Sequence, residues 1–221
     1  PYRDMFLAHL LDGAVESQGI LRSYPAGWLR EHPLDQTTEV LENTSWSCHH
    51  GVGRWNGQCP CTPGDGKWKH MLRQAFDHLA TELDDLFVEV VKPFAPDPWR
   101  LRDEYIQVLL GQISVETLIA AQSNRSLTNG QIQRVYQMLE AQRERQRMYT
   151  SCGWFFDDFD RIEPRNNVAY AAQAVRLARL ASGVDLRSAV LQDLGQVVSP
   201  RTKLRADVLF QRLLDRAEKG A

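Results

Sequence analysis

The chain has 221 residues, which is enough for one large domain or two small ones. Its 43% hydrophobic content allows a substantial core, while a formal net charge of −2 and a pI near 6.4 argue against binding to nucleic acid or to anionic membrane surfaces. No apolar run approaches the roughly 20 residues of a membrane-spanning helix, and residues 1–21 lack the pattern of a secretion signal. We therefore expect a cytoplasmic protein without a membrane partner.

Hydrophobic residues recur at helical spacing along most of the chain. In chain order, the pattern predicts helices over Tyr2–Gln18, Ala26–Glu31, Lys67–Val91, Trp99–Leu110, Val115–Ala121, Leu127–Met148, Asn167–Ala181, Leu186–Leu194 and Leu204–Ala217. The best strand candidate is the short segment Thr37–Leu41. The predicted fold class is mainly α: an irregular helical bundle with long functional loops and at most one or two short strands.

Two segments depart from this helical pattern. The first, Glu42–Cys61 (ENTSWSCHHGVGRWNGQCPC), holds three of the four cysteines, two of the six tryptophans and an adjacent histidine pair. Its glycines and proline indicate an irregular loop. The second, Tyr149–Asp160 (YTSCGWFFDDFD), holds the fourth cysteine. Because reactive residue types are confined to two loops between helices, we expect the loops to converge into one site on a helical scaffold.

The cysteines are candidate metal ligands, since a cysteine cluster in the cytosol more often binds metal or acts in catalysis than forms disulfides. Cys48, Cys59, Cys61 and Cys152 could surround zinc or an iron–sulfur cluster, with His50 as a possible substitute ligand. The Cys-x-Cys spacing departs from the usual Cys-x2-Cys. Two alternatives stay open: buried cysteines that act as small hydrophobes, or an oxidised pair. A disulfide between Cys59 and Cys61 is disfavoured because the connecting segment is too short.

The histidine pair has several possible roles. His49 and His50 could supply a base, a ligand or a hydrogen-bond donor. They could equally be anchored by backbone carbonyls in a glycine-rich loop. A further alternative is an independent metalloenzyme in which both histidines and the thiolates surround a metal-bound water.

The tryptophans near the two loops suggest a carbohydrate surface. A sugar ring stacks on the face of an indole, while neighbouring Asp, Asn, Arg and His side chains bind its hydroxyls. The candidate substrate-binding residues are Trp46, His50, Arg54, Trp55, Trp154, Asp157 and Asp158. The alternative is that the rings fill the core beneath long loops. Asp157 and Asp158 point to different sides of the chain and so do not form a facing acid–base pair; a role as helix N-cap is favoured for one of them.

The two loop sequences resemble a known family. Glu42–Cys61, and Met148–Asp158 (MYTSCGWFFDD) with the Ala-rich helix that follows, resemble the C-terminal helical region of bacterial glycoside hydrolase family 57-type proteins, a domain of unknown function of the DUF3536 type. The resemblance extends over nearly the whole chain. It predicts a junction with a catalytic barrel over residues 1–41 and a helical accessory domain over residues 42–221. The sequence departs from the family pattern at His49 and Pro60.

The resemblance implies a role in carbohydrate metabolism. It implies retaining hydrolysis or transfer on α-glucans, which needs two carboxyl groups about 5 Å apart. In the family these groups lie in the barrel, so no catalytic residue is assigned here. We expect a non-catalytic accessory domain that packs on the N-terminal catalytic barrel of the same polypeptide and helps shape an α-glucan or oligosaccharide cleft. The four cysteines coincide with the family's signatures. A purely structural interdomain module is the alternative.

Overall fold

The structure, a computed structural model, describes residues 42–45, 47–57, 59–62 and 64–219. Apart from Glu42, these residues belong to one compact unit that runs from Asn43 to Ala221. The helices predicted over Tyr2–Gln18 and Ala26–Glu31, and the strand predicted over Thr37–Leu41, lie outside the described residues.

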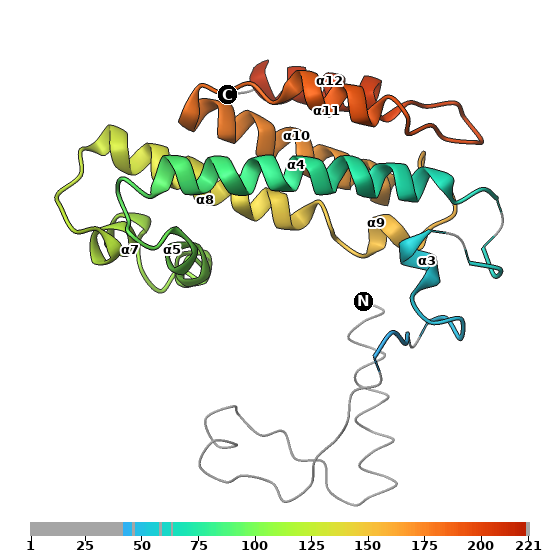
Figure 1. The fold of residues 1–221 in the computed structure, drawn as a ribbon, viewed down its shortest axis with the longest axis horizontal. Coiled ribbons are helices and arrows are strands. Elements are labelled where there is room, and N and C mark those ends of the chain that lie inside the picture. Colours follow the sequence, from blue (N-terminus) through green and yellow to red (C-terminus); the bar gives the residue numbers. More distant parts are fainter. Residues whose placement is uncertain (1–41, 46, 58, 63, 220–221) are drawn as a thin grey trace, which may run out of the picture. The chain divides into compact units, whose positions relative to one another are not determined.

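The described part of the chain is helical, as predicted (Figure 1). Its helices are α3 (Gly53–Asn56), α4 (Lys67–Val91), α5 (Pro98–Glu104), α6 (Ile106–Leu109), α7 (Val115–Gln122), α8 (Asn129–Arg147), α9 (Cys152–Phe155), α10 (Ile162–Ser182), α11 (Arg187–Leu194) and α12 (Ala206–Lys219). Among these residues there is no strand, and Val198 and Arg205 form an isolated antiparallel bridge. No helix in the described ranges combines the length and apolar character needed to cross a bilayer.

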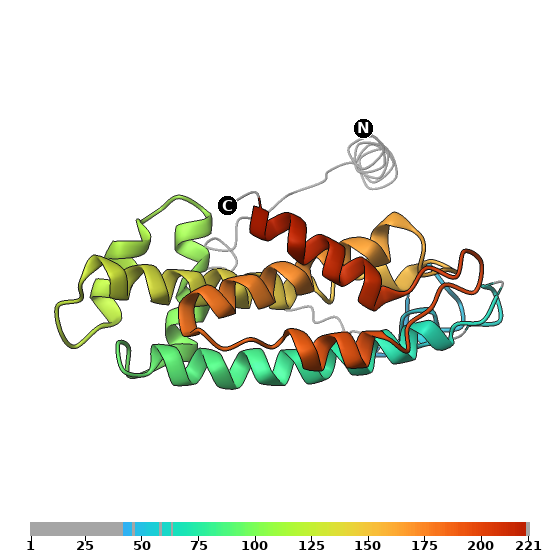
Figure 2. The same cartoon turned by 90° about the horizontal axis from the view of Figure 1, so that it is seen from above.

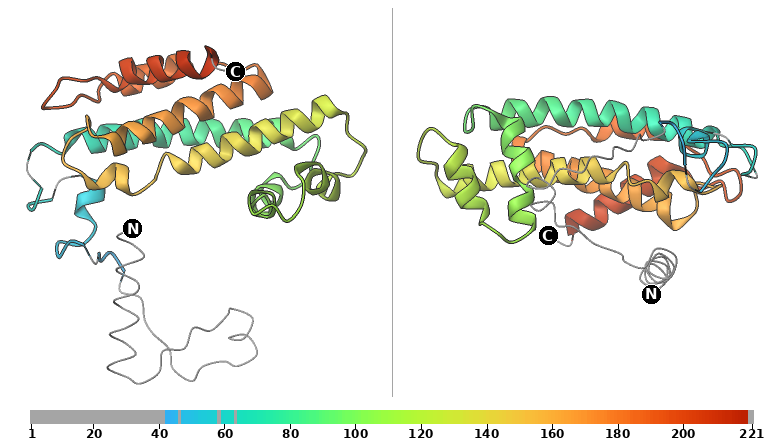
Figure 3. Two further views of the ribbon diagram at one scale, coloured as in Figure 1. Left: turned by 180° about the vertical axis from the view of Figure 1, so that it is seen from behind. Right: turned by 90° about the horizontal axis from the view of Figure 1, so that it is seen from below.

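The three long helices α4, α8 and α10 form the centre of the unit. Helix α10 packs against α8, α4 and α12, and α11 lies against α4 and α12 (Figure 2). The short helices α5, α6 and α7 lie at one end of the long helices, whereas α3 and α9 lie together at the other end (Figure 3). The end that holds α3 and α9 contains both unusual loops.

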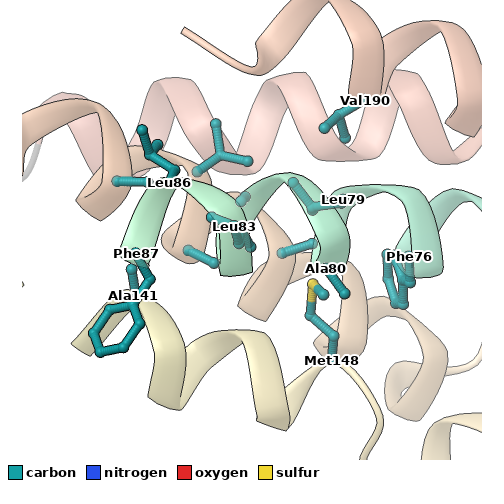
Figure 4. Packing of buried hydrophobic residues seen from close by; sticks show 14 of the residues in the cluster. Phe76, Leu79, Ala80, Leu83, Leu86, Phe87, Ala141, Met148 and Val190 are labelled. Atoms are coloured by element: carbon teal, nitrogen blue, oxygen red, sulfur yellow. The ribbon is translucent and has the colours of Figure 1, made fainter. Parts of the chain in front are cut away.

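Helix α4 supplies one wall of the core. Its hydrophobic residues recur every three or four positions, and Leu72, Phe76, Leu83 and Phe87 are all fully buried. Figure 4 shows Phe76, Leu83 and Phe87 among the packed side chains. On α10 the corresponding positions are mostly alanine, which lets this helix approach α8 closely. The core therefore combines large side chains from α4 with small ones from α10.

The predicted helices agree with the structure except at several ends. The predicted Lys67–Val91 coincides with α4, whereas the predicted Trp99–Leu110 divides at Tyr105 into α5 and α6. Helix α10 begins at Ile162, before the predicted Asn167, because Pro164 lies in its first turn, where a missing N–H costs no helical hydrogen bond. Thr128 is the N-cap of α8 and forms a capping box with Gln131.

Candidate metal centre

Four side chains in the first loop bring their donor atoms together. The Sγ atoms of Cys48, Cys59 and Cys61 and a ring nitrogen of His50 all lie within 4.8 Å of one another. Cys48 and Cys59 are buried, whereas His50 and Cys61 are exposed. All three cysteines are free thiols. This group can hold a metal ion.

Two tight turns on either side of α3 create the cluster. In the first turn the Gly51 N–H donates to the Cys48 carbonyl oxygen (3.1 Å), and in the second the Thr62 N–H donates to the Cys59 carbonyl oxygen (2.9 Å). Each turn therefore carries donor side chains at its first and third positions. This geometry accounts for the Cys-x-His and Cys-x-Cys spacings, because a four-residue turn brings those two side chains to the same side.

The residues between the ligands suit these turns. Gly51 has φ +74°, which a residue with a side chain adopts only at a cost, and a Cβ at this position would lie 2.6 Å from the Asn43 carbonyl oxygen. In the second turn Pro60 follows Cys59, the position where its fixed φ favours a turn. Pro60, a departure from the family pattern, is thus compatible with the cluster.

The donor atoms lie somewhat closer together than the ligands of a single zinc ion. Sγ of Cys48 lies 3.5 Å from Sγ of Cys59 and of Cys61, and the Cys59 and Cys61 sulfurs are 3.0 Å apart. Nδ1 of His50 lies 3.4 Å from the Cys59 sulfur and 3.8 Å from the Cys48 sulfur. A tetrahedral zinc ion with Zn–S bonds of about 2.3 Å separates its sulfur ligands by about 3.8 Å. Small outward movements of the thiols would reach this geometry.

The thiols are already partly arranged for metal binding. Hydrogen bonds from Cys59, then from His50 and Arg54, lower the pKa of Cys61 to about 5. The same contact with Cys61 raises the pKa of Cys59. The metal-free pair therefore holds a thiolate on Cys61 beside a protonated Cys59. A thiolate is the form of cysteine that binds metal.

The second unusual segment contacts this loop, which confirms that the two converge. The Arg54 guanidinium lies 4.4 Å from the centre of the Phe155 ring, and the Trp55 and Phe155 rings are 5.6 Å apart. Nearby, the Trp68 indole N–H donates to the Asp157 carbonyl oxygen (3.3 Å). Helices α3 and α9 thus join positions far apart in the sequence.

Cys152 does not belong to the cluster, which corrects the four-cysteine expectation. It is the first residue of α9, its side chain is exposed, and the fourth donor is His50 instead. The reason is that α9 meets α3 through the aromatic ring of Phe155 rather than through its first residue.

The predicted sugar-binding residues are dispersed. Trp46 lies outside the described residues. Trp154 is only 1% exposed and packs edge-on against Phe76 with the Arg73 guanidinium over its face, so it does not present its ring to a ligand. For this tryptophan the core-filling alternative holds. Trp55, in the first loop, is half-buried.

The aspartates also differ from expectation. The buried carboxylate of Asp158 accepts the backbone N–H groups of Asp160 (3.0 Å) and Arg201 (3.2 Å), and so ties two loops together. The N-cap of α10 is Arg161, without a side-chain cap, so neither Asp157 nor Asp158 fulfils the predicted capping role. Asp158 is a structural residue with both oxygens occupied.

Lys69 was missed by the sequence interpretation. It is 2% exposed on α4, and its ammonium group donates to the Arg54 carbonyl oxygen (2.6 Å). Burial, and then the charge of Arg54, lower its pKa to about 8. Its position three residues before Leu72, on the apolar face, was the available signal: a lysine at a core position usually has a buried partner.

Two surface hollows lie away from this cluster. One, of about 550 Å³, lies between α7 and the start of α8 and includes Ile119 and Arg125. The other, of about 530 Å³, lies between α5, α6 and α8 and includes Tyr105 and Arg143. Neither hollow is lined by a residue that the sequence predicts to bind metal or sugar. The predicted metal ligands that converge lie at the opposite end of the bundle, beside α3.

A comparison with family models shows which protein family the chain belongs to. Residues 65–214 match the domain of unknown function DUF3536. The chain belongs to the DUF3536 family. The matched residues begin after Cys61, so all four donors precede the part of the DUF3536 chain that defines the match. Comparisons with curated proteins and with solved structures gave no match.

Proposed function

We propose that this DUF3536 chain is a non-catalytic helical module of a larger carbohydrate-active protein, with its first loop held by a structural zinc ion. The observation that carries the metal assignment is the convergence of Cys48, His50, Cys59 and Cys61 to within 4.8 Å. Reduced cytosolic thiols would keep these donors available for metal.

Zinc fits the donor set better than an iron–sulfur cluster does. Zinc takes four thiolate or imidazole ligands around one ion. A cluster of several irons distributes its ligands over separate metal atoms and usually requires four cysteines. The compact group of three thiols and one imidazole suits a single ion.

The donor count favours a structural role. Structural zinc sites are closed by four protein ligands, whereas catalytic sites keep one position for water or substrate. Here the four donors lie on two turns that flank α3, and their joint coordination would fix a loop of little regular structure. The independent metalloenzyme alternative requires an open position and is less well supported.

The accessory role rests on the resemblance to the helical region of family 57-type glycosidases. Both signature segments contribute to the α3–α9 contact, through Arg54 and Trp55 on one side and Phe155 on the other. We propose that this end of the bundle packs on the catalytic barrel of the same polypeptide and borders an α-glucan cleft. Arg54, Trp55 and Asp157 are the remaining candidates for sugar contact, because each is only half-buried.

Metal analysis of the reduced, purified chain tests the zinc site. We expect close to one zinc ion per chain, lost in Cys48→Ser and Cys59→Ser. Cys152→Ser is the matched control and should retain zinc. Absence of zinc and iron, with unchanged stability of the serine variants, would instead favour a purely structural interdomain module.

Carbohydrate assays test the accessory role. The isolated chain should not hydrolyse α-glucans, and maltooligosaccharide binding, measured by Trp fluorescence, should weaken in Trp55→Ala. Hydrolysis that disappears when a single carboxylate is replaced would reject the non-catalytic assignment. Absence of any oligosaccharide binding would reject the proposed contribution to the cleft and leave only the packing on the barrel.

A further inference from the structure

The proposed zinc site has an unbalanced charge. A divalent ion with three thiolates and a neutral imidazole carries one net negative charge. Two of the donors, Cys48 and Cys59, are buried. Charged sites of this kind are stabilised by hydrogen bonds and positive charge next to the ligands. The neighbouring side chains therefore bear on which ion is held and how tightly.

Arg54 occupies this position. Its Nη2 donates to the Cys61 sulfur (3.2 Å) and to the Cys61 carbonyl oxygen (3.5 Å), so one guanidinium nitrogen contacts both the ligand atom and the backbone of the second turn. Within the described residues Arg54 forms no ion pair with a carboxylate. Its charge is directed at the thiol cluster.

Two further contacts hold Arg54 in place. Phe155 of α9 lies under the guanidinium at 4.4 Å, and the buried ammonium group of Lys69 donates to the Arg54 carbonyl oxygen. One contact fixes the head of the side chain and the other fixes its backbone. A buried lysine is costly unless it is paired, so the Lys69 ammonium group requires the Arg54 carbonyl oxygen at this position.

We propose that Arg54 is the positioning residue of the zinc site: it holds the Cys61 thiolate and offsets the negative charge of the three-thiolate, one-imidazole set. This inference rests on the proposed zinc site. It also connects the two signature segments, because the residue that steadies Cys61 is itself steadied by α9. Arginine suits this role better than lysine, since a planar guanidinium hydrogen-bonds and stacks on an aromatic ring at the same time.

The test measures cobalt(II) and zinc affinity of the whole chain by competition with a chromophoric chelator. Arg54→Gln should weaken binding by about 10- to 100-fold, the usual effect of losing a group that supports a metal ligand. Arg54→Lys, which keeps the charge, should lose less. The matched control is Arg161→Gln, because Arg161 also lies over a phenyl ring, that of Phe156 at 4.5 Å, and within the described residues it pairs with Glu163 rather than with a thiol.

Two further measurements separate positioning from folding. The sulfur-to-cobalt charge-transfer bands should change in Arg54→Gln and stay unchanged in Arg161→Gln. The urea midpoint of the metal-free Arg54→Gln chain should stay close to that of the metal-free wild type. Equal affinity of wild type and Arg54→Gln would overturn the role of Arg54 and leave the zinc site standing. Failure of the wild type to bind either metal would overturn the zinc site itself.

Discussion

Gly153 and Asn167 fit against each other without room for another atom. A Cβ added to Gly153 would lie within 3.0 Å of Cγ, Oδ1 and Nδ2 of Asn167. Asn167 is buried, and its amide donates to the Thr150 carbonyl oxygen (3.1 Å), so it has little freedom to withdraw. This contact sets the distance between α9 and α10, and thereby the position of Phe155.

Gly153→Ala should destabilise the chain. The added methyl group overlaps a buried, hydrogen-bonded side chain, and overpacking of this kind costs about 1–3 kcal/mol. Urea unfolding followed by circular dichroism measures the change. Gly130→Ala is the control: it adds the same methyl group in α8, where no atom lies within 4 Å, and should be neutral or stabilising by up to about 1 kcal/mol. Equal effects of both changes would contradict the packing argument.

Most of the fold could be predicted from the sequence, because the helices carry clear periodic patterns. Lys67–Val91 shows an apolar residue at nearly every core position and coincides with α4. The short helices α3 and α9 were not predicted, since four residues contain little more than one turn and no period. Their positions are determined by tertiary contacts, such as that between Trp55 and Phe155, which no local pattern encodes.

The number of protons released on zinc binding should reveal that the thiols of Cys59 and Cys61 differ in pKa. The pKa of Cys61 is lowered to about 5, so above that pH it is already a thiolate in the metal-free chain. The pKa of Cys59 is raised, so this thiol keeps its proton and must lose it when metal binds. At pH 8 the three cysteines together should therefore release fewer than three protons. Below pH 5 Cys61 is protonated too, and zinc affinity should fall more steeply as the pH is lowered.

Calorimetry in buffers of different ionisation enthalpy counts these protons. Cys61→Ser should bind zinc more weakly but release as many protons as wild type. Cys59→Ser removes the hydrogen bond that contributes most to the lowered pKa of Cys61, so Cys61 should then keep more of its proton and release it on binding. Fewer protons released by Cys61→Ser than by wild type would show that Cys61 keeps its proton in the metal-free chain.

Asp158→Ala should cost about 1–3 kcal/mol, because two backbone N–H groups, those of Asp160 and Arg201, lose a charged, buried acceptor. Thermal or urea denaturation measures this loss. Asp103→Ala provides a control, since Asp103 is exposed and forms its ion pair with its neighbour Arg102, an interaction worth little. A sugar-binding role for Asp158 without a structural one would leave stability unchanged.

Leu83→Ala should cost about 2–5 kcal/mol, since Leu83 is fully buried at the centre of α4 and its truncation leaves a cavity. Leu180→Ala removes the same atoms from a side chain that is 50% exposed and should change the free energy of unfolding by less than about 0.5 kcal/mol. Similar losses at both positions would show that Leu83 contributes no more to the core than an exposed leucine.

The candidate site could be predicted only in part. The residue types alone indicated Cys48, Cys59 and Cys61 as metal ligands and His50 as an alternative ligand. The choice between His50 and Cys152, however, depends on how α9 meets α3. Spacing within a single turn can be read from sequence, whereas the distance between two loops cannot. Trp154 shows the same limit, because burial under Arg73 arises from packing between helices.

The proposed zinc-binding cluster has an open half and a closed half. Cys48 and Cys59 lie inside, while His50 and Cys61 face water. An ion could thus enter or leave through the open half while the bundle stays folded. Demetallation and global unfolding would then be separate events with separate rates, and a depleted molecule would keep two anchored thiols ready for reloading.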